Sequence, residues 1–90
     1  QRDLMHSKNL DLFYYDECFF CQKVLREIKN LNLKVSYRHI YEDQKNLQTL
    51  LEKTGRKTTP CLFINGEPMF ESDDIIEWLR ENHTKIEKNN

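Results

Sequence analysis

Two cysteines separated by two residues, Cys18 and Cys21, place the strongest constraint on how this 90-residue chain can fold. Ahead of them, residues 10–15 read Leu-Asp-Leu-Phe-Tyr-Tyr, an alternating and aromatic pattern that is typical of a buried strand. Behind them, apolar residues from Val24 to Leu31 recur at the spacing of one helix face. The cysteines therefore lie where a strand gives way to a helix, and we expect the chemistry of the chain at that junction.

We expect Cys18 to be the N-cap of this helix. Its sulfur would then face the free backbone N–H groups of Phe20 and Cys21 and the positive end of the helix dipole, and both favour thiolate over thiol. Cys18 is therefore the predicted nucleophile. Cys21, one turn into the helix, would point back toward Cys18 while shielded from solvent, which suits a resolving thiol.

Two other roles for the cysteine pair compete with this interpretation. A structural zinc site would need two further ligands, and the remaining candidates are scattered singly along the chain: His6, His39, Cys61 and His83. A structural disulfide would close too short a loop to restrict the unfolded chain much. We therefore expect a redox-active pair and no metal.

The composition indicates one small domain over residues 1–90, with flexible polar ends at 1–9 and 84–90. Lys and Arg number 14 and Asp and Glu 15, so neither a nucleic acid nor an anionic membrane is a predicted partner. No apolar run approaches the roughly 18 residues of a membrane span. Three cysteines are too few for a disulfide scaffold, which favours a reducing compartment, and we expect the cytoplasm. We also expect the chain to be a monomer.

The middle of the chain predicts a second strand and a second helix. Residues 34–40 alternate at Val35, Tyr37 and His39, which indicates a strand with one covered face, parallel to the first because a helix separates the two. A lone histidine in a strand is more often structural than catalytic, and we assign His39 no catalytic role. Asp43 is the expected cap of the next helix.

The last third of the chain predicts a hairpin and a third helix. Gly55 ends the second helix, and Pro60 opens a strand over residues 61–64. Asn65-Gly66 predicts a tight turn into a short antiparallel edge strand. Ser72 then caps a final helix whose first turn carries two acids, where the dipole favours them.

The predicted order is β-α-β-α-β-β-α, an α/β fold with a four-stranded mixed sheet flanked by three helices. With a C-x-x-C opening the first helix and a proline opening the third strand, the chain resembles a glutaredoxin of the thioredoxin fold, from about Leu10 to His83. The motifs that carry the resemblance are Tyr14-Tyr-Asp-Glu-Cys-Phe-Phe-Cys21, Thr58-Thr-Pro60 and Glu71-Ser-Asp-Asp74. The first and last also resemble the transferase-like glutaredoxins and the N-terminal domain of glutathione S-transferases.

The resemblance implies glutathione as the reducing cosubstrate and a role for each motif. Pro60 is expected to be cis and to lie against the cysteines, with Thr59 offering its backbone N–H and C=O to the cysteinyl part of glutathione. Ser72 and Asp73 are expected at the γ-glutamyl end, where cap donors suit its carboxylate and an acid suits its ammonium.

The glycyl carboxylate of glutathione needs a cation, and the resemblance places Arg56 or Lys57 there. The chain also departs from the family pattern. Phe19 and Phe20 replace the usual Pro-Tyr between the cysteines, and Tyr15 stands where many members have a lysine. Lys23, on the first helix, is a candidate to supply the missing positive charge.

Three functions follow from these observations. The leading hypothesis is a glutathione-dependent thiol–disulfide oxidoreductase that reduces glutathione mixed disulfides and protein disulfides, with Cys18 as nucleophile and Cys21 as resolving thiol. A second is a carrier in which Cys18 and glutathione hold a [2Fe–2S] cluster. A third is a binding module that keeps the fold without turnover.

Overall fold

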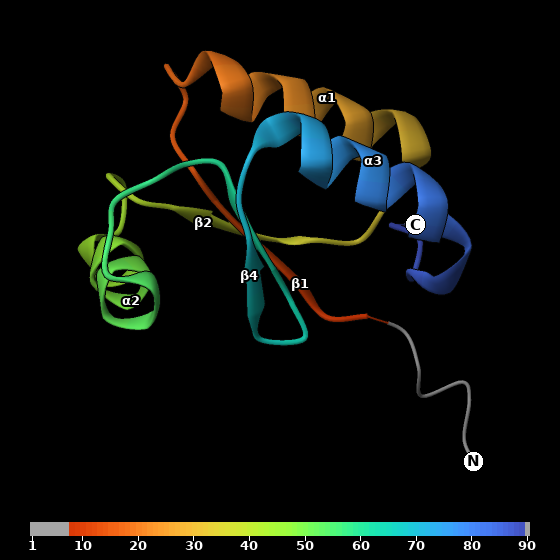
Figure 1. Cartoon of the computed structure of the whole chain (residues 1–90). Coiled ribbons are helices and arrows are strands. Elements are labelled where there is room, and N and C mark those ends of the chain that lie inside the picture. Colours follow the sequence, from red (N-terminus) through yellow and green to blue (C-terminus); the bar gives the residue numbers. More distant parts are fainter. Residues whose placement is uncertain (1–7, 90) are drawn as a thin grey trace.

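The computed structural model describes residues 8–89. A four-stranded sheet has α1 and α3 side by side on one face and α2 on the other (Figure 1). In chain order the elements are β1 (Leu10–Tyr14), α1 (Phe19–Leu31), β2 (Ser36–His39), α2 (Gln44–Thr54), β3 (Cys61–Ile64), β4 (Glu67–Met69), α3 (Ser72–Asn82) and the short 3₁₀-helix η2 (His83–Lys85).

The sheet has the strand order β2-β1-β3-β4. β1 pairs in parallel with β2 and antiparallel with β3, and β3 pairs antiparallel with β4. The predicted fold class is confirmed in element order, sheet type and helix number. Pro68 lies on β4, an edge strand, where the missing N–H of proline is tolerated.

Adjacent residues of β1 point to opposite faces of the sheet and so supply both hydrophobic layers. Leu12 packs with Val24, Ile28, Ile75 and Leu79 under α1 and α3. On the other face the buried residues are Phe13, Ile40, Leu50, Cys61 and Phe63, with α2 covering them. The cysteine-bearing end of α1 is therefore anchored to a strand that is buried on both sides.

Local sequence patterns set the ends of α2 and the β3–β4 turn. The Asp43 side chain accepts a hydrogen bond from Lys45 N at 3.0 Å, which confirms the predicted cap. Gly55 ends α2 with a φ of 79°, a conformation that a residue without a Cβ adopts readily. Asn65 and Gly66 both have positive φ, 51° and 91°, as a type I′ turn requires.

The second strand is shorter and more exposed than the sequence predicts. Alternation predicts a strand over residues 34–40 with one covered face, whereas β2 spans Ser36–His39 and Tyr37 is 47% exposed. β2 lies at the edge of the sheet, so only β1 borders it and its outer edge has no neighbouring strand. Val35 still packs against the core from outside the strand.

The C-terminal segment also differs from the expectation of a flexible end at 84–90. Ile86 is 4% exposed and belongs to the α1/α3 core layer. Lys34 N donates to Glu87 O at 2.8 Å, and Lys88 forms a bridge with Leu33. The buried Ile86 side chain and these backbone contacts together hold the segment against the rest of the fold. Residues 1–7 and 90 of the predicted flexible ends lie outside the described residues.

None of the helices within residues 8–89 is both long enough and apolar enough to cross a membrane.

A bidentate ion pair joins α1 to α3. Arg80 Nε and Nη2 donate to the Glu27 carboxylate at 2.9 and 3.2 Å, and these hydrogen bonds are the main cause of a lowered pKa of Glu27. When folding lowers the pKa of a carboxylate, the charged group stabilises the fold at any pH above its pKa in the unfolded chain. This contribution disappears as the pH falls through its pKa in the folded protein.

We therefore expect Glu27→Gln to lower the Tm at pH 7, and the difference from the parent chain to close as the pH falls below the ordinary range of a glutamate pKa. Thermal melts between pH 2.5 and 7 would measure this gap. Glu77→Gln removes a charge from an exposed position of α3 and is the control. A gap that stays constant across this pH range would contradict the ion-pair explanation.

Candidate active site

Cys18 is the N-cap of α1, as predicted. Its backbone is extended, α1 begins at Phe19, and its sulfur accepts a hydrogen bond from Cys21 N at 3.2 Å. The two sulfurs are paired as a disulfide, with Cα atoms 5.1 Å apart. Cys18 is 7% exposed and Cys21 is completely buried, so an incoming group meets Cys18 first.

The loop before β3 brings a second hydrogen-bond donor to Cys18. The Thr59–Pro60 peptide bond is cis, as expected, and Thr59 Oγ1 donates to Cys18 Sγ at 3.6 Å. Thr59 O also lies 3.9 Å from the same sulfur. The backbone N–H of Cys21 and the hydroxyl of Thr59 thus both point at Cys18, and in the reduced protein both favour the thiolate. The sequence indicated only the backbone of Thr59 and missed its hydroxyl.

The start of α3 differs from its prediction. Ser72 is the first helical residue, and the cap position belongs to Glu71, whose carbonyl accepts the first intrahelical bond from Ile75 N at 3.0 Å. Glu71 has a φ of 72° and makes no side-chain capping bond. Ser72 is therefore not the cap, and it is only 7% exposed. A positive φ at a glutamate is not predictable from residue preferences, which place it in turns at Gly or Asn.

Asp73, in the first turn of α3, lies against a cation from α1. Its Oδ1 is 3.1 Å from Lys23 Nζ, and Lys23 Nζ is also 5.8 Å from the centre of the Phe20 ring. Lys23 was a candidate to supply charge near the cysteines, and the structure pairs it with Asp73. The contact depends on α1 and α3 running next to each other (Figure 1).

The two cations of the Thr59 loop each lie on an aromatic ring. The Arg56 guanidinium is 4.1 Å from the centre of Phe70, and Lys57 Nζ is 5.5 Å from the centre of Tyr41. Cation–π contacts restrict both side chains while leaving their charges available. The structure thus holds Arg56 and Lys57 on the loop that carries Thr59.

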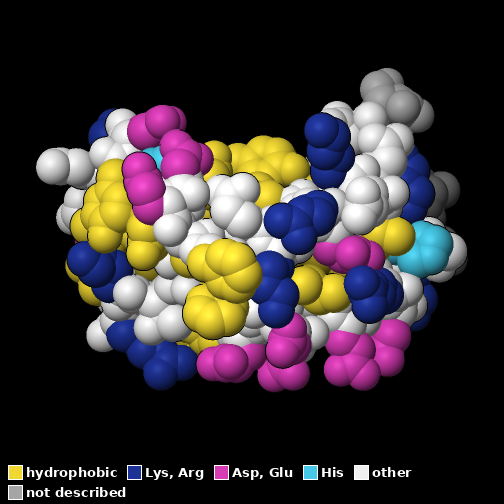
Figure 2. All heavy atoms as spheres, turned by 90° about the horizontal axis from the view of Figure 1, so that it is seen from above, with side chains coloured by type: hydrophobic (Ala, Val, Ile, Leu, Met, Phe, Trp, Pro, Cys, Tyr) yellow, Lys and Arg dark blue, Asp and Glu magenta, His cyan; other side chains and the backbone are white. Residues whose placement is uncertain are grey.

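Two phenylalanines leave a large apolar surface next to Cys18. Phe19 is 71% exposed and Phe20 55%, with their rings edge to face at 5.6 Å. Figure 2 shows hydrophobic side chains in several patches on the side of the molecule that carries α1 and α3, with basic and acidic side chains between and beside them.

The third cysteine, Cys61, is separated from this chemistry. It is fully buried in the α2 layer, and burial raises the pKa of its thiol to about 12. The expectation that Cys61 points into the core is confirmed. At neutral pH it is protonated and unreactive.

His39 meets two acids at the end of β2. Its Nε2 lies 3.2 Å from Asp16 Oδ2 and 3.9 Å from Glu42 Oε2, without the alignment of a hydrogen bond. The three ligand atoms lie within 4.8 Å of one another, as in a metal site. However, His39 Nδ1 accepts backbone N–H bonds from Tyr41 and Glu42, so the ring proton is on Nε2, the nitrogen facing the acids. This tautomer cannot bind a cation through Nε2.

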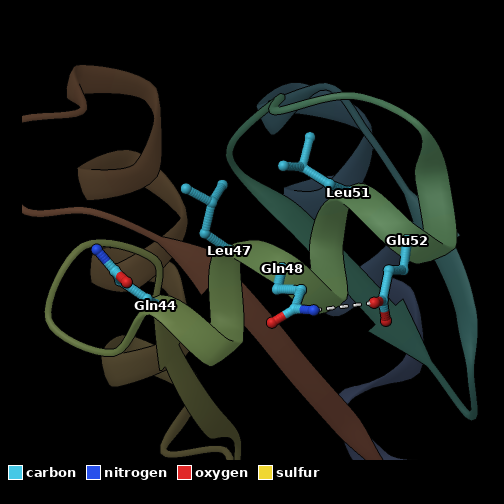
Figure 3. Close-up of a pocket in the computed structure, with 5 residues that line it drawn as sticks. All are labelled: Gln44, Leu47, Gln48, Leu51 and Glu52. Carbon is cyan, nitrogen blue, oxygen red and sulfur yellow. Dashed lines mark hydrogen bonds between the residues drawn. The ribbon is translucent and has the colours of Figure 1, made fainter.

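A hollow of about 410 Å³ lies along α2, on the opposite side of the sheet from α1 and α3. Figure 3 shows Leu47 and Leu51 on the upper side of the helix and a hydrogen bond between Gln48 and Glu52. Gln44 completes the lining. These side chains supply no thiol or imidazole, and the reactive groups remain at the start of α1.

In a comparison with known protein families, residues 12–87 match the family described as "Glutathione S-transferase, N-terminal domain". A "Probable glutaredoxin" of Acanthamoeba polyphaga mimivirus is 32% identical over 79 residues, covering 76% of this chain and 74% of the relative. Glutaredoxin-C4 of Arabidopsis thaliana is 35% identical over 75 residues, covering 79% of this chain and 55% of that protein. The chain belongs to the glutaredoxin family.

Solved structures agree on the fold. A wheat glutaredoxin has a TM-score of 0.70 at 24% identity, with 94% of this chain and 88% of that chain covered. An epsilon-class glutathione S-transferase from the housefly, Musca domestica, has a TM-score of 0.68 at 23% identity. That match covers 83% of this chain but only 35% of the transferase, so the chain spans about a third of that protein. Together the glutaredoxin relatives and the Cys18–Cys21 pair support a thiol oxidoreductase of glutaredoxin type.

Proposed function

We propose that this glutaredoxin is a glutathione-dependent thiol–disulfide oxidoreductase that reduces glutathione mixed disulfides and protein disulfides. The observation that carries the proposal is the environment of Cys18. Its sulfur lies at a helix N-terminus, accepts hydrogen bonds from Cys21 N and Thr59 Oγ1, and is the less buried member of a cysteine pair. These features suit a sulfur that is a thiolate at neutral pH and reacts with an incoming disulfide before Cys21 does.

With a glutathione mixed disulfide, the Cys18 thiolate attacks the glutathionyl sulfur. The mixed disulfide breaks, the substrate thiolate leaves with the electron pair and takes a proton from water, and Cys18 becomes glutathionylated. A second glutathione thiolate then attacks the glutathione sulfur on Cys18. Oxidised glutathione forms and the Cys18 thiolate is restored.

With a protein disulfide, Cys18 forms a mixed disulfide with one substrate sulfur and the other leaves as a thiolate. The Cys21 thiolate then attacks Cys18 Sγ, which releases the substrate and forms the Cys18–Cys21 disulfide. The Cα atoms of the two cysteines lie 5.1 Å apart, because Cys18 is the N-cap of the helix whose first turn carries Cys21. Two glutathiones return the pair to the dithiol.

Glutathione would bind along the groups that surround Cys18. We assign the backbone of Thr59 and the cis Pro60 to its cysteinyl part and Arg56 or Lys57 to its glycyl carboxylate. The buckwheat relative was solved as a "glutaredoxin-glutathione complex", at 24% identity and a TM-score of 0.66.

The first turn of α3 would take the γ-glutamyl group. Because the Ser72 side chain is buried, we assign the γ-glutamyl carboxylate to backbone N–H groups at the start of α3 more than to the Ser72 hydroxyl. Asp73 would take the γ-glutamyl ammonium. Such a reaction needs a glutathione pool, and we place it in a reducing compartment such as the cytoplasm, carried out by a monomer.

A coupled assay tests the proposal directly. The reduced protein is given a glutathionylated peptide, glutathione, glutathione reductase and NADPH, and NADPH oxidation is followed. We expect turnover that saturates with the glutathionylated peptide and requires glutathione. No turnover above the rate without protein, with the same protein active on a protein disulfide, would contradict glutathione dependence.

Asp73 gives the sharpest test of the proposed glutathione site. We expect Asp73→Asn to lower the second-order rate constant for a glutathionylated peptide about fivefold, equivalent to about 1 kcal/mol of lost ammonium pairing. We expect a small effect because Asp73 is 85% exposed, and ion pairs at exposed positions are weak. The rate constant for the mixed disulfide of the same peptide with 2-mercaptoethanol should change much less, since 2-mercaptoethanol carries no ammonium. Asp74→Asn, in the same helical turn, is the matched control.

A further inference from the structure

Asp73 is already engaged by an ammonium group of this chain. Lys23 Nζ lies 3.1 Å from Asp73 Oδ1, and the γ-glutamyl end of glutathione would bring a second ammonium to the same carboxylate. Lys23 is 33% exposed and leans over the Phe20 ring, whereas Asp73 is 85% exposed. The lysine therefore reaches Asp73 from the protein side and leaves its solvent side open.

We infer that Lys23 competes with the ammonium of the γ-glutamyl group for Asp73 and so sets how strongly this protein prefers glutathione over other thiol adducts. The inference rests on the proposed function. A carboxylate has enough lone pairs for two donors, but two ammonium groups at one carboxylate leave an excess positive charge and repel each other. Bound glutathione must therefore displace Lys23 or accept weakened pairing.

The position of Lys23 makes displacement feasible. Its side chain lies five residues after Cys18 on α1, and the ring of Phe20 gives it a second place to rest when Asp73 is taken. Asp73 is largely exposed and Lys23 is one-third exposed, and ion pairs that solvent can reach are weak and screened by salt. Lys23 thus lowers the affinity for the γ-glutamyl group without blocking its site.

The test is a single-turnover reaction of the reduced protein with a fluorescent peptide carrying one glutathione. The same peptide blocked by 2-mercaptoethanol is the reference, and the readout is the ratio of the two second-order rate constants. This ratio cancels any change in the reactivity of Cys18 itself. No free glutathione is present, so only one glutathione-binding event is measured.

We expect Lys23→Met to raise this ratio about two- to fivefold, the range that loss of an exposed ion pair allows. Lys23→Arg, which keeps the cation, should restore a ratio near that of the parent chain. The gain from Lys23→Met should shrink at high ionic strength. Lys29→Met makes the same charge change in the last turn of α1 and is the matched control.

A double-mutant cycle separates this inference from the proposed function. If Lys23 competes for Asp73, Asp73→Asn should cost more in the Lys23→Met background than in the parent, because the carboxylate is then free for the ligand. A ratio that falls with Lys23→Met means that Lys23 itself contacts glutathione, and the inference is wrong. No change with Lys23→Met while Asp73→Asn lowers the ratio also overturns it but leaves the glutathione site intact. If neither variant changes the ratio, both the inference about Lys23 and the proposed glutathione site at Asp73 are wrong.

Discussion

Cys18→Ser is expected to reduce removal of glutathione from a mixed disulfide to the uncatalysed rate. A serine hydroxyl at this position keeps the N-cap and the hydrogen bond from Cys21 N but supplies no thiolate to attack sulfur. Single-turnover mixing with a glutathionylated peptide measures the rate. Cys61→Ala, a change at the buried thiol, is the control and should keep the activity once its folding is verified.

Residual turnover of Cys18→Ser above the uncatalysed rate would mean that Cys21 can attack substrate from its buried position. Because Cys21 is completely buried behind Cys18, that outcome would require α1 to open at its first turn. Mass spectrometry of the trapped glutathionyl adduct would show which sulfur carries it.

Cys21→Ser is expected to separate the two activities. Reduction of a protein disulfide should fall by more than about tenfold, because intramolecular attack by Cys21 acts at an effective concentration far above that of free glutathione. Removal of glutathione needs only Cys18 and a second glutathione, so it should be kept or raised. Insulin reduction and the coupled glutathione assay, run on the same preparation, measure the two reactions.

Equal loss of both activities in Cys21→Ser would contradict this division of labour. The chain would then use an obligatory dithiol cycle, and the glutathione groups assigned around Asp73 and Thr59 would lose their role.

Features that depend on neighbouring residues could be predicted from the sequence. The caps at Cys18 and Asp43, the helix end at Gly55 and the turn at Asn65-Gly66 each follow from local hydrogen bonding or backbone freedom. Hydrophobic periodicity then placed most strands and helices in the right order. The cysteine pair marked the site because its chemistry is carried by two residues in one helical turn.

Features that depend on distances between elements could not be predicted. The hydroxyl of Thr59 reaches Cys18 across 41 residues of sequence, and Lys23 reaches Asp73 across 50. Neither contact has a pattern along the chain, because each depends on how close one loop or helix lies to another. Ile86 shows the same limit, since one apolar residue has no period that could indicate burial.

Burial of Cys61 protects its thiol from reagents for as long as the protein is folded. When Cys18 and Cys21 are paired as a disulfide, the free thiol is Cys61, which is protonated at neutral pH and enclosed between the sheet and α2. Cys61 can then be modified only in molecules whose α2 layer has come apart. With the Cys18–Cys21 disulfide intact, the rate at which a thiol reagent labels Cys61 therefore reports opening of the domain under conditions where nearly every molecule is native.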